Sequence, residues 1–227
     1  MKIYISGIGM EVRRKKIKNL YLSIRPPDGR VEISAPLSMP DKMIEDFVRE
    51  KLEWIRRKRK KYEEVCPEKE RQYESGEILY VWGKPYRLVY QEGGRKNSFE
   101  LCGDEGILSM RSGSTAKQRE AYLREQYRLM LKEEVARLLP EWEMKTGLYC
   151  NSWRTKQMKT RWGTCNTTQK RVWFNVQLAE KPKECLEYVI LHELAHLKVS
   201  NHGMAFRAIM DKHMPQWQEV KKKLNGG

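Results

Sequence analysis

Three of the four histidines in this 227-residue chain fall within eleven residues, as His192, His196 and His202. The first two belong to the run HELAH, and the third follows after five intervening residues. Residues four apart project from one face of an α-helix, so His192 and His196 can contact a single ion if this run is helical. The spacing therefore constrains the run to a helix and indicates a metal site on it.

The residues around this run favour a helix from about Pro182 to Val199. Proline suits a first helical turn, and apolar residues recur on the face that would pack against a core. These apolar residues are Leu186, Val189, Ile190, Leu194 and Leu197. The polar residues after Val199 are poor helix formers, and Gly203 permits an unusual turn. We therefore expect the chain to reverse there and bring His202 back to the ion.

Three imidazole ligands leave one coordination position open, which is the pattern of catalytic rather than structural zinc sites. We therefore expect one Zn²⁺ per chain. Glu193 lies about 100° around the helix from His192, so it can reach a water at the metal without being a ligand. Its expected role is that of general base. The alternative is a chance pattern, since HExxH is short, but the third histidine favours a metal site; His213 is expected to be a surface or packing residue.

The composition is that of a packed globular protein, with 40% apolar residues, seven Trp and eleven Tyr. No apolar run approaches the length that spans a bilayer, so we expect a soluble chain without an export signal. The five cysteines are widely spaced and form no CxxC pair, which argues against a disulfide framework. A cytoplasmic location is therefore expected. Cys165 lies close to a motif of interest, but its expected role is that of a small buried residue.

The formal net charge of +15 predicts attraction to polyanions. The densest basic run spans residues 56–61 and continues a predicted helix. It could contact nucleic acid or the phosphates of a nucleotide, or it could be one solvated helix face. The sequence leaves these two interpretations open.

The first half of the chain predicts a β-rich N-terminal domain over residues 1–112 that contains one helix. Strands are expected over residues 20–24 and 30–34, joined as a hairpin, and a helix over 41–55. A second β-rich stretch, over residues 77–110, predicts two or three further antiparallel strands.

A second domain is expected over residues 113–227. It opens with a capping box and a long helix over 115–139 that ends at Pro140. Short strands are expected over 153–159 and 171–177, and one strand beside the metal helix could offer its edge to an extended peptide. The predicted class is α+β, with a minimal zincin-like domain built from the long helix, a small sheet and the metal-binding helix.

Several motifs together resemble those of the YgjP-like metal-dependent hydrolase family, small relatives of gluzincin and SprT-like zinc proteases. The motifs are Leu20–Ile24 with Asp28-Gly29, Trp54-Ile55, Arg161–Cys165, Tyr188-Val189 leading into HELAHL, Asn201-His202-Gly203, and Phe206. The resemblance covers residues 10 to 224. It implies that His192, His196 and His202 hold zinc and that Glu193 is the catalytic carboxylate. Thr164 and Arg207 depart from the family pattern, which puts substrate fit in question rather than metal binding.

The leading hypothesis is a zinc metallopeptidase of the HExxH-x5-H type that cleaves a peptide or protein substrate. Arg161, Tyr188 and Asn175 are candidate transition-state or substrate contacts, although Tyr188 is more readily a packed aromatic residue. The resemblance also implies an alternative, a metal-dependent nucleoside triphosphate pyrophosphohydrolase acting on UTP. A further alternative is a nucleic-acid-associated SprT-like protease. The physiological substrate and the oligomeric state stay open.

Overall fold

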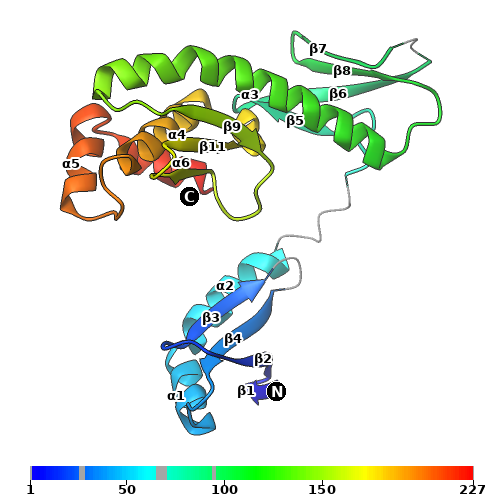
Figure 1. Cartoon of the computed structure of the whole chain (residues 1–227). Helices are drawn as coiled ribbons and strands as arrows, with labels where there is room; N and C mark the ends of the chain where they lie inside the picture. Colours follow the sequence, from blue (N-terminus) through cyan, green and yellow to red (C-terminus); the bar gives the residue numbers. More distant parts are fainter. Residues whose placement is uncertain (1, 26–28, 65–70, 94–95, 227) are drawn as a thin grey trace. The chain divides into compact units, whose positions relative to one another are not determined.

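The computed structural model describes residues 2–25, 29–64, 71–93 and 96–226, which form two compact units, Met1–Glu70 and Arg71–Gly227 (Figure 1). Both units combine sheets and helices, so the predicted α+β class is confirmed. Within the described residues, no helix is both long enough and apolar enough to cross a bilayer.

The N-terminal unit is a four-stranded sheet with two helices. Its elements are β1 (Lys2–Ile5), β2 (Ile8–Lys15), β3 (Tyr21–Arg25), β4 (Arg30–Pro36), α1 (Asp41–Glu50) and α2 (Leu52–Glu64). The strand order is β1-β2-β4-β3, and the expected hairpin is confirmed, with β3 antiparallel to β4. The expected single helix is divided at Lys51 into α1 and α2.

The basic run lies on α2. Arg56, Arg57 and Lys58 are exposed, whereas the side chains of Lys60 and Lys61 lie outside the described residues. Arg56 forms an ion pair with Glu53 at 3.0 Å. A nucleic-acid role for the run stays a prediction.

The C-terminal unit contains two sheets and the long helix α3 (Ala116–Thr146). The first sheet has the order β5-β6-β8-β7, and the second has the order β10-β11-β9. The other elements are β5 (Ile78–Val81), β6 (Lys84–Glu92), β7 (Ser98–Cys102), β8 (Glu105–Met110), β9 (Ser152–Lys156), β10 (Gly163–Asn166), β11 (Arg171–Asn175), the 3-10 helix η1 (Val176–Glu180), α4 (Lys183–His196), α5 (Met204–His213) and α6 (Trp217–Leu224). The first sheet has four strands rather than two or three, and β6 and β8 are parallel.

The β5–β8 sheet belongs to the C-terminal unit, so the division of the chain differs from the boundary expected at residue 112. The turn after β5 contacts η1, where the Trp82 backbone N–H donates to the Ala179 carbonyl at 2.8 Å. Val81 is buried in the same apolar cluster as α4. A Cβ on Gly83, whose φ is +79°, would lie 2.7 Å from Pro182 at the start of α4. These contacts join residues that are distant in sequence. A boundary placed from local composition therefore differs from the division that the contacts give.

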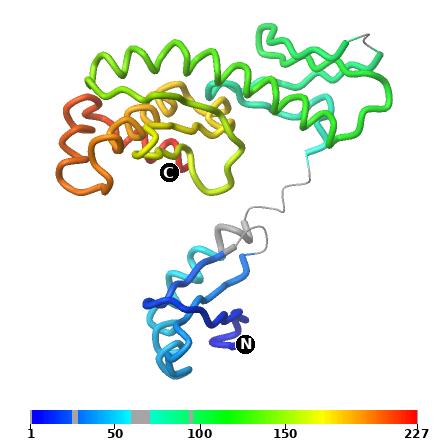
Figure 2. Tube along the Cα trace, viewed as in Figure 1, coloured from blue at the N-terminus to red at the C-terminus, as the bar shows by residue number. Residues whose placement is uncertain are grey.

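The long helix α3 begins with the predicted capping box, in which Thr115 and Gln118 exchange side-chain and backbone hydrogen bonds. It continues through Pro140 to Thr146, so the prediction that it ends at Pro140 was wrong; Figure 2 shows the unbroken path. Proline removes one backbone donor and costs about 3 kcal/mol in a helix interior. Pro140 lies on the exposed side, where water can satisfy the freed carbonyl, and the buried Trp142 anchors the following turn.

Candidate metal centre and catalytic cleft

The helix α4 carries two of the three predicted metal ligands. It is buried on most sides, with nine of its fourteen residues buried, so its position in the core is fixed by packing. It ends at His196, three residues earlier than expected, and the loop that follows leads back to His202 just before α5. The helix and the returning loop therefore bring all three histidines to one place.

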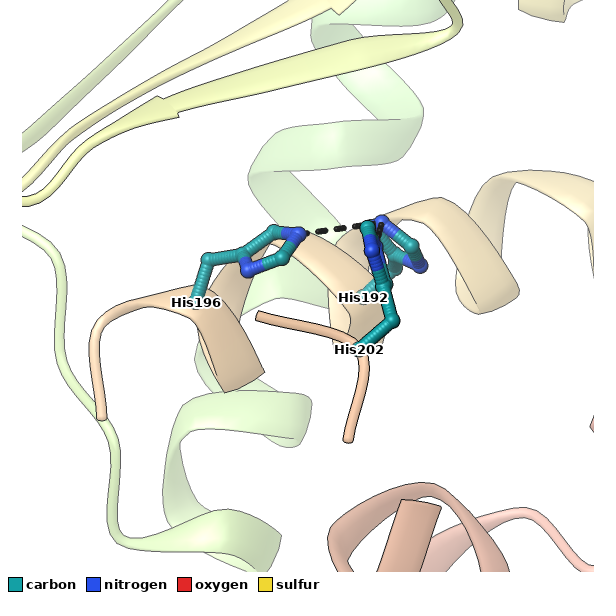
Figure 3. A group of neighbouring side chains, drawn as sticks. All are labelled: His192, His196 and His202. Atoms are coloured by element: carbon teal, nitrogen blue, oxygen red, sulfur yellow. Dashed lines mark hydrogen bonds between the residues drawn. The ribbon is translucent and has the colours of Figure 1, made fainter. Parts of the chain in front are cut away.

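The three imidazole rings converge through their Nε2 atoms, as Figure 3 shows. The Nε2 of His192 lies 3.2 Å from that of His196 and 3.1 Å from that of His202. Zn–N bonds of about 2.0–2.1 Å in a tetrahedral arrangement place ligand nitrogens about 3.3 Å apart. The observed spacing fits one zinc-sized ion.

The other ring nitrogens of the two helical ligands have protein partners. His196 Nδ1 lies 3.0 Å from the Val199 carbonyl oxygen, to which it can donate, and His192 Nδ1 lies 3.4 Å from the Tyr188 hydroxyl. Partners of this kind orient a metal ligand and fix which nitrogen faces the ion. Phe206 packs against all three imidazoles, with ring centroids 4.7–5.1 Å apart. The protein therefore holds the Nε2 lone pairs toward their common centre.

The environment favours the neutral imidazoles that metal binding requires. Burial, reinforced by the neighbouring His196 and His202, lowers the pKa of His192 to about 3. Burial also lowers the pKa of His202. The three histidines offer neutral nitrogen donors, and the Nδ1 atoms of His192 and His196 have hydrogen-bond partners. Three such donors, with the fourth coordination position left open, match the ligand set of a catalytic zinc ion.

Glu193 lies beside the triad and is 5% exposed. Burial raises the pKa of its carboxyl to about 8, while the positive charge of Arg161 acts in the opposite direction. The backbone of Gly163 on β10 approaches this carboxyl closely, because a Cβ there would lie 2.6 Å from Glu193 Oε1. Only a residue without a side chain leaves the Glu193 carboxyl in this place.

The triad and Glu193 open into a cleft of about 560 Å³ within the C-terminal unit. Its lining includes residues of β10 and the α6 residues Lys221 and Leu224. In the part of the chain that the structure describes, β10 is an edge strand, paired with β11 on one side. The sequence predicted an edge strand beside the metal helix, but β10 lies in the segment between the two strands that had been expected.

The remaining candidate residues have different places. Arg161 and Tyr188 line the cleft. The Tyr188 ring stacks on Trp217 at 6.4 Å, so its alternative interpretation as a packed aromatic residue also fits. Asn175 is 2% exposed, and its amide nitrogen donates to the carbonyls of Met158 and Arg161 at 2.9 and 2.8 Å. Asn175 therefore holds the loop that leads to Arg161, rather than lining the cleft.

Cys165, which was expected to be a small buried residue, is partly exposed and lines the cleft. Burial together with the Glu193 carboxyl raises the pKa of its thiol to about 11. One hydrogen bond beside the cleft was not predicted from the sequence: Trp162 Nε1 donates to Asn225 Oδ1 at 3.2 Å, which ties the segment before β10 to the end of α6. No local pattern signals this bond, because its partners are 63 residues apart.

The chain is similar to a described protein family and, at low sequence identity, to solved structures. Similar solved structures include the metallopeptidase zymogen abylysin of Pyrococcus abyssi, with 22% identity, a TM-score of 0.38, and coverage of 40% of this chain and 90% of that one. Another is the zymogen jannalysin of Methanocaldococcus jannaschii, with 25% identity, a TM-score of 0.34, and coverage of 42% and 94%. A search of curated proteins finds no match. A family model, the YgjP-like metallopeptidase domain, matches residues 18–226 and thus includes the triad and the cleft. The chain belongs to the YgjP-like metallopeptidase domain family.

Proposed function

We propose that this chain is a zinc peptidase of the HExxH-x5-H type, in which His192, His196 and His202 hold the ion and Glu193 is the general base. The observation that carries the proposal is the convergence of three Nε2 atoms beside the buried Glu193 carboxyl. The Nε2 of His192 lies 3.2 Å from that of His196 and 3.1 Å from that of His202. A zinc ion held there would supply Lewis acidity, which polarises a peptide carbonyl and lowers the pKa of water.

In this proposal, the ionised Glu193 takes a proton from the attacking water and passes it to the departing amine. Burial raises the pKa of this carboxyl to about 8, and the positive charge of Arg161 acts against that rise. A metal cation held by the three histidines would favour the ionised carboxylate further. Arg161 is a positively charged hydrogen-bond donor that lines the cleft. We assign it the role of stabilising the negative charge that develops on the carbonyl oxygen. We assign Tyr188 to the orientation of His192, because its hydroxyl faces Nδ1 rather than Nε2.

The substrate in this proposal is an extended peptide that adds to the free edge of β10. Edge strands present unpaired backbone donors and acceptors, and peptide binding by strand addition uses these groups. Because β10 passes next to Glu193 at Gly163, a peptide on this edge is placed against the catalytic carboxyl.

The test is hydrolysis by the zinc-loaded full chain, measured separately on a library of peptides and on UTP. We expect peptide cleavage that a chelator abolishes. Glu193→Gln should lower the rate by at least about a hundredfold while one zinc per chain is retained. Glu187→Gln, on the same helix but outside the cleft, should cleave at the wild-type rate. Phosphate release from UTP without peptide cleavage would replace this proposal with the pyrophosphohydrolase alternative.

A further inference from the structure

Three successive lysines on α6 have different surroundings. Lys223 forms an ion pair with Glu184 at 3.0 Å, and Lys222 is exposed outside the cleft. Lys221 is exposed as well, but it lines the cleft that contains the three histidines. If the three lysines only kept this helix face in contact with water, all three would have similar surroundings. Lys221 differs from the other two because it lines the cleft.

Lys221 presents a positive charge to the catalytic cleft. It lines both the main cleft and a smaller adjoining cavity of about 80 Å³ beside His192 and His202. Its ammonium lies 5.8 Å from the ring centroid of Trp217, a cation–π contact that favours this placement. Within the described ranges of the chain, no ion pair joins Lys221 to a carboxylate, so its charge is available to a ligand.

The polarity of β10 shows which part of a bound peptide would meet Lys221. A peptide that pairs antiparallel with β10 runs from the Asn166 end toward the Gly163 end. Gly163 lies against Glu193, so the peptide residues after the scissile bond continue past Gly163 toward Trp162. The hydrogen bond from Trp162 to Asn225 places α6 at this end, and Lys221 lies one turn before Asn225.

We propose that Lys221 determines substrate specificity by binding a carboxylate immediately after the scissile bond. The carboxylate is that of an Asp or Glu side chain, or the peptide's own C-terminal carboxylate if cleavage removes a single residue. This inference rests on the proposed peptidase function.

The first test measures binding, so that it does not depend on turnover. Zinc-loaded Glu193→Gln protein is titrated with fluorescein-labelled decapeptides that differ at one position, Glu or Gln, each with a free or an amidated C-terminus. We expect the carboxylate form to bind about fivefold more tightly, as for an exposed ion pair. In this Glu193→Gln background, a second substitution, Lys221→Gln, should remove the preference for the carboxylate form. Lys221→Glu in the same background should instead bind a peptide with Lys at that position more tightly. Lys222→Gln is the matched control and should retain the wild-type preference.

The second test reads the residue after each bond that the wild-type and Lys221→Gln proteins cleave in a mixed peptide library. Enrichment of Asp or Glu identifies a side chain as the source of the carboxylate, and release of single C-terminal residues identifies the chain end. Either pattern should disappear in Lys221→Gln with a rise in KM rather than a fall in kcat. Equal binding of all four decapeptides, or a preference that survives in Lys221→Gln, would overturn the inference. Preferential binding without any cleavage would instead count against the peptidase function alone.

Discussion

The buried carboxyl of Glu193 predicts an unusual pH dependence of stability in the metal-free protein. Its pKa is about 8 in the fold, where burial disfavours the charged form, against 4.5 as the ordinary value. Folding at neutral pH therefore takes up a proton. Because the folded pKa is the raised one, the associated stability is fully present below about pH 4.5 and is lost as the pH rises toward 8.

The magnitude follows from the two pKa values. Each pH unit between them changes the free energy of unfolding by about 1.4 kcal/mol, and the whole interval corresponds to roughly 5 kcal/mol. Glu193→Gln keeps the shape of the side chain and removes its titration. The variant should therefore gain stability relative to wild type by up to that amount between pH 4.5 and 8, and no more above it.

The assay is urea unfolding of both proteins with a chelator present, at half-unit intervals from pH 4.5 to 9. The stability difference between the two proteins isolates Glu193, because the other titrating groups are common to both. Glu133→Gln, an exposed position on α3, is the control and should give a difference that does not change with pH. A difference for Glu193→Gln that is flat across this range would refute the reasoning that burial keeps this carboxyl protonated. Added zinc should reduce the slope, since a cation favours the ionised form.

Three further predictions concern single positions. Gly163→Ala should lower kcat by about a hundredfold with zinc content unchanged, because the added methyl displaces the Glu193 carboxyl; an unaltered kcat would show that the close approach is not needed. Pro140→Ala should raise the free energy of unfolding by about 1–3 kcal/mol in urea titrations, since it restores a helical donor, and a destabilised variant would contradict this. At pH 8, iodoacetamide should label the exposed Cys102 well before the partly buried Cys165, whose thiol pKa is about 11, as followed by peptide mass spectrometry; equal rates would contradict the raised pKa of Cys165.

The sequence was sufficient to predict that the three histidines converge, because the geometry that brings them together is local. Two of the histidines share one helix, and the third follows after a short loop whose polar residues and glycine predict a reversal. Glu193 is placed by the same helix. The spacing of these residues therefore predicts their convergence without knowledge of the rest of the fold.

The parts that sequence reasoning did not reach depend on contacts between distant segments. The strand β10 is four residues long and has no clear alternation, so its role becomes visible only beside β11 and α4. Lys221 looks like one of three similar lysines until the fold places it in the cleft. The expectation that proline ends a helix fails at Pro140, because burial of Trp142 and its neighbours stabilises the helix beyond the proline.

The long helix α3 contributes to two separate apolar clusters of the C-terminal unit. Its first half packs on the β5–β8 sheet through Leu123, its second half packs against the metal helix through residues such as Leu131, and Met130 contacts both clusters. Because one continuous helix packs in both apolar clusters, we expect the two clusters to unfold in a single cooperative event. Amide protons of the β5–β8 sheet and of α4 should then exchange with similar opening free energies. A destabilising substitution in that sheet should therefore also destabilise the helix that carries His192 and His196.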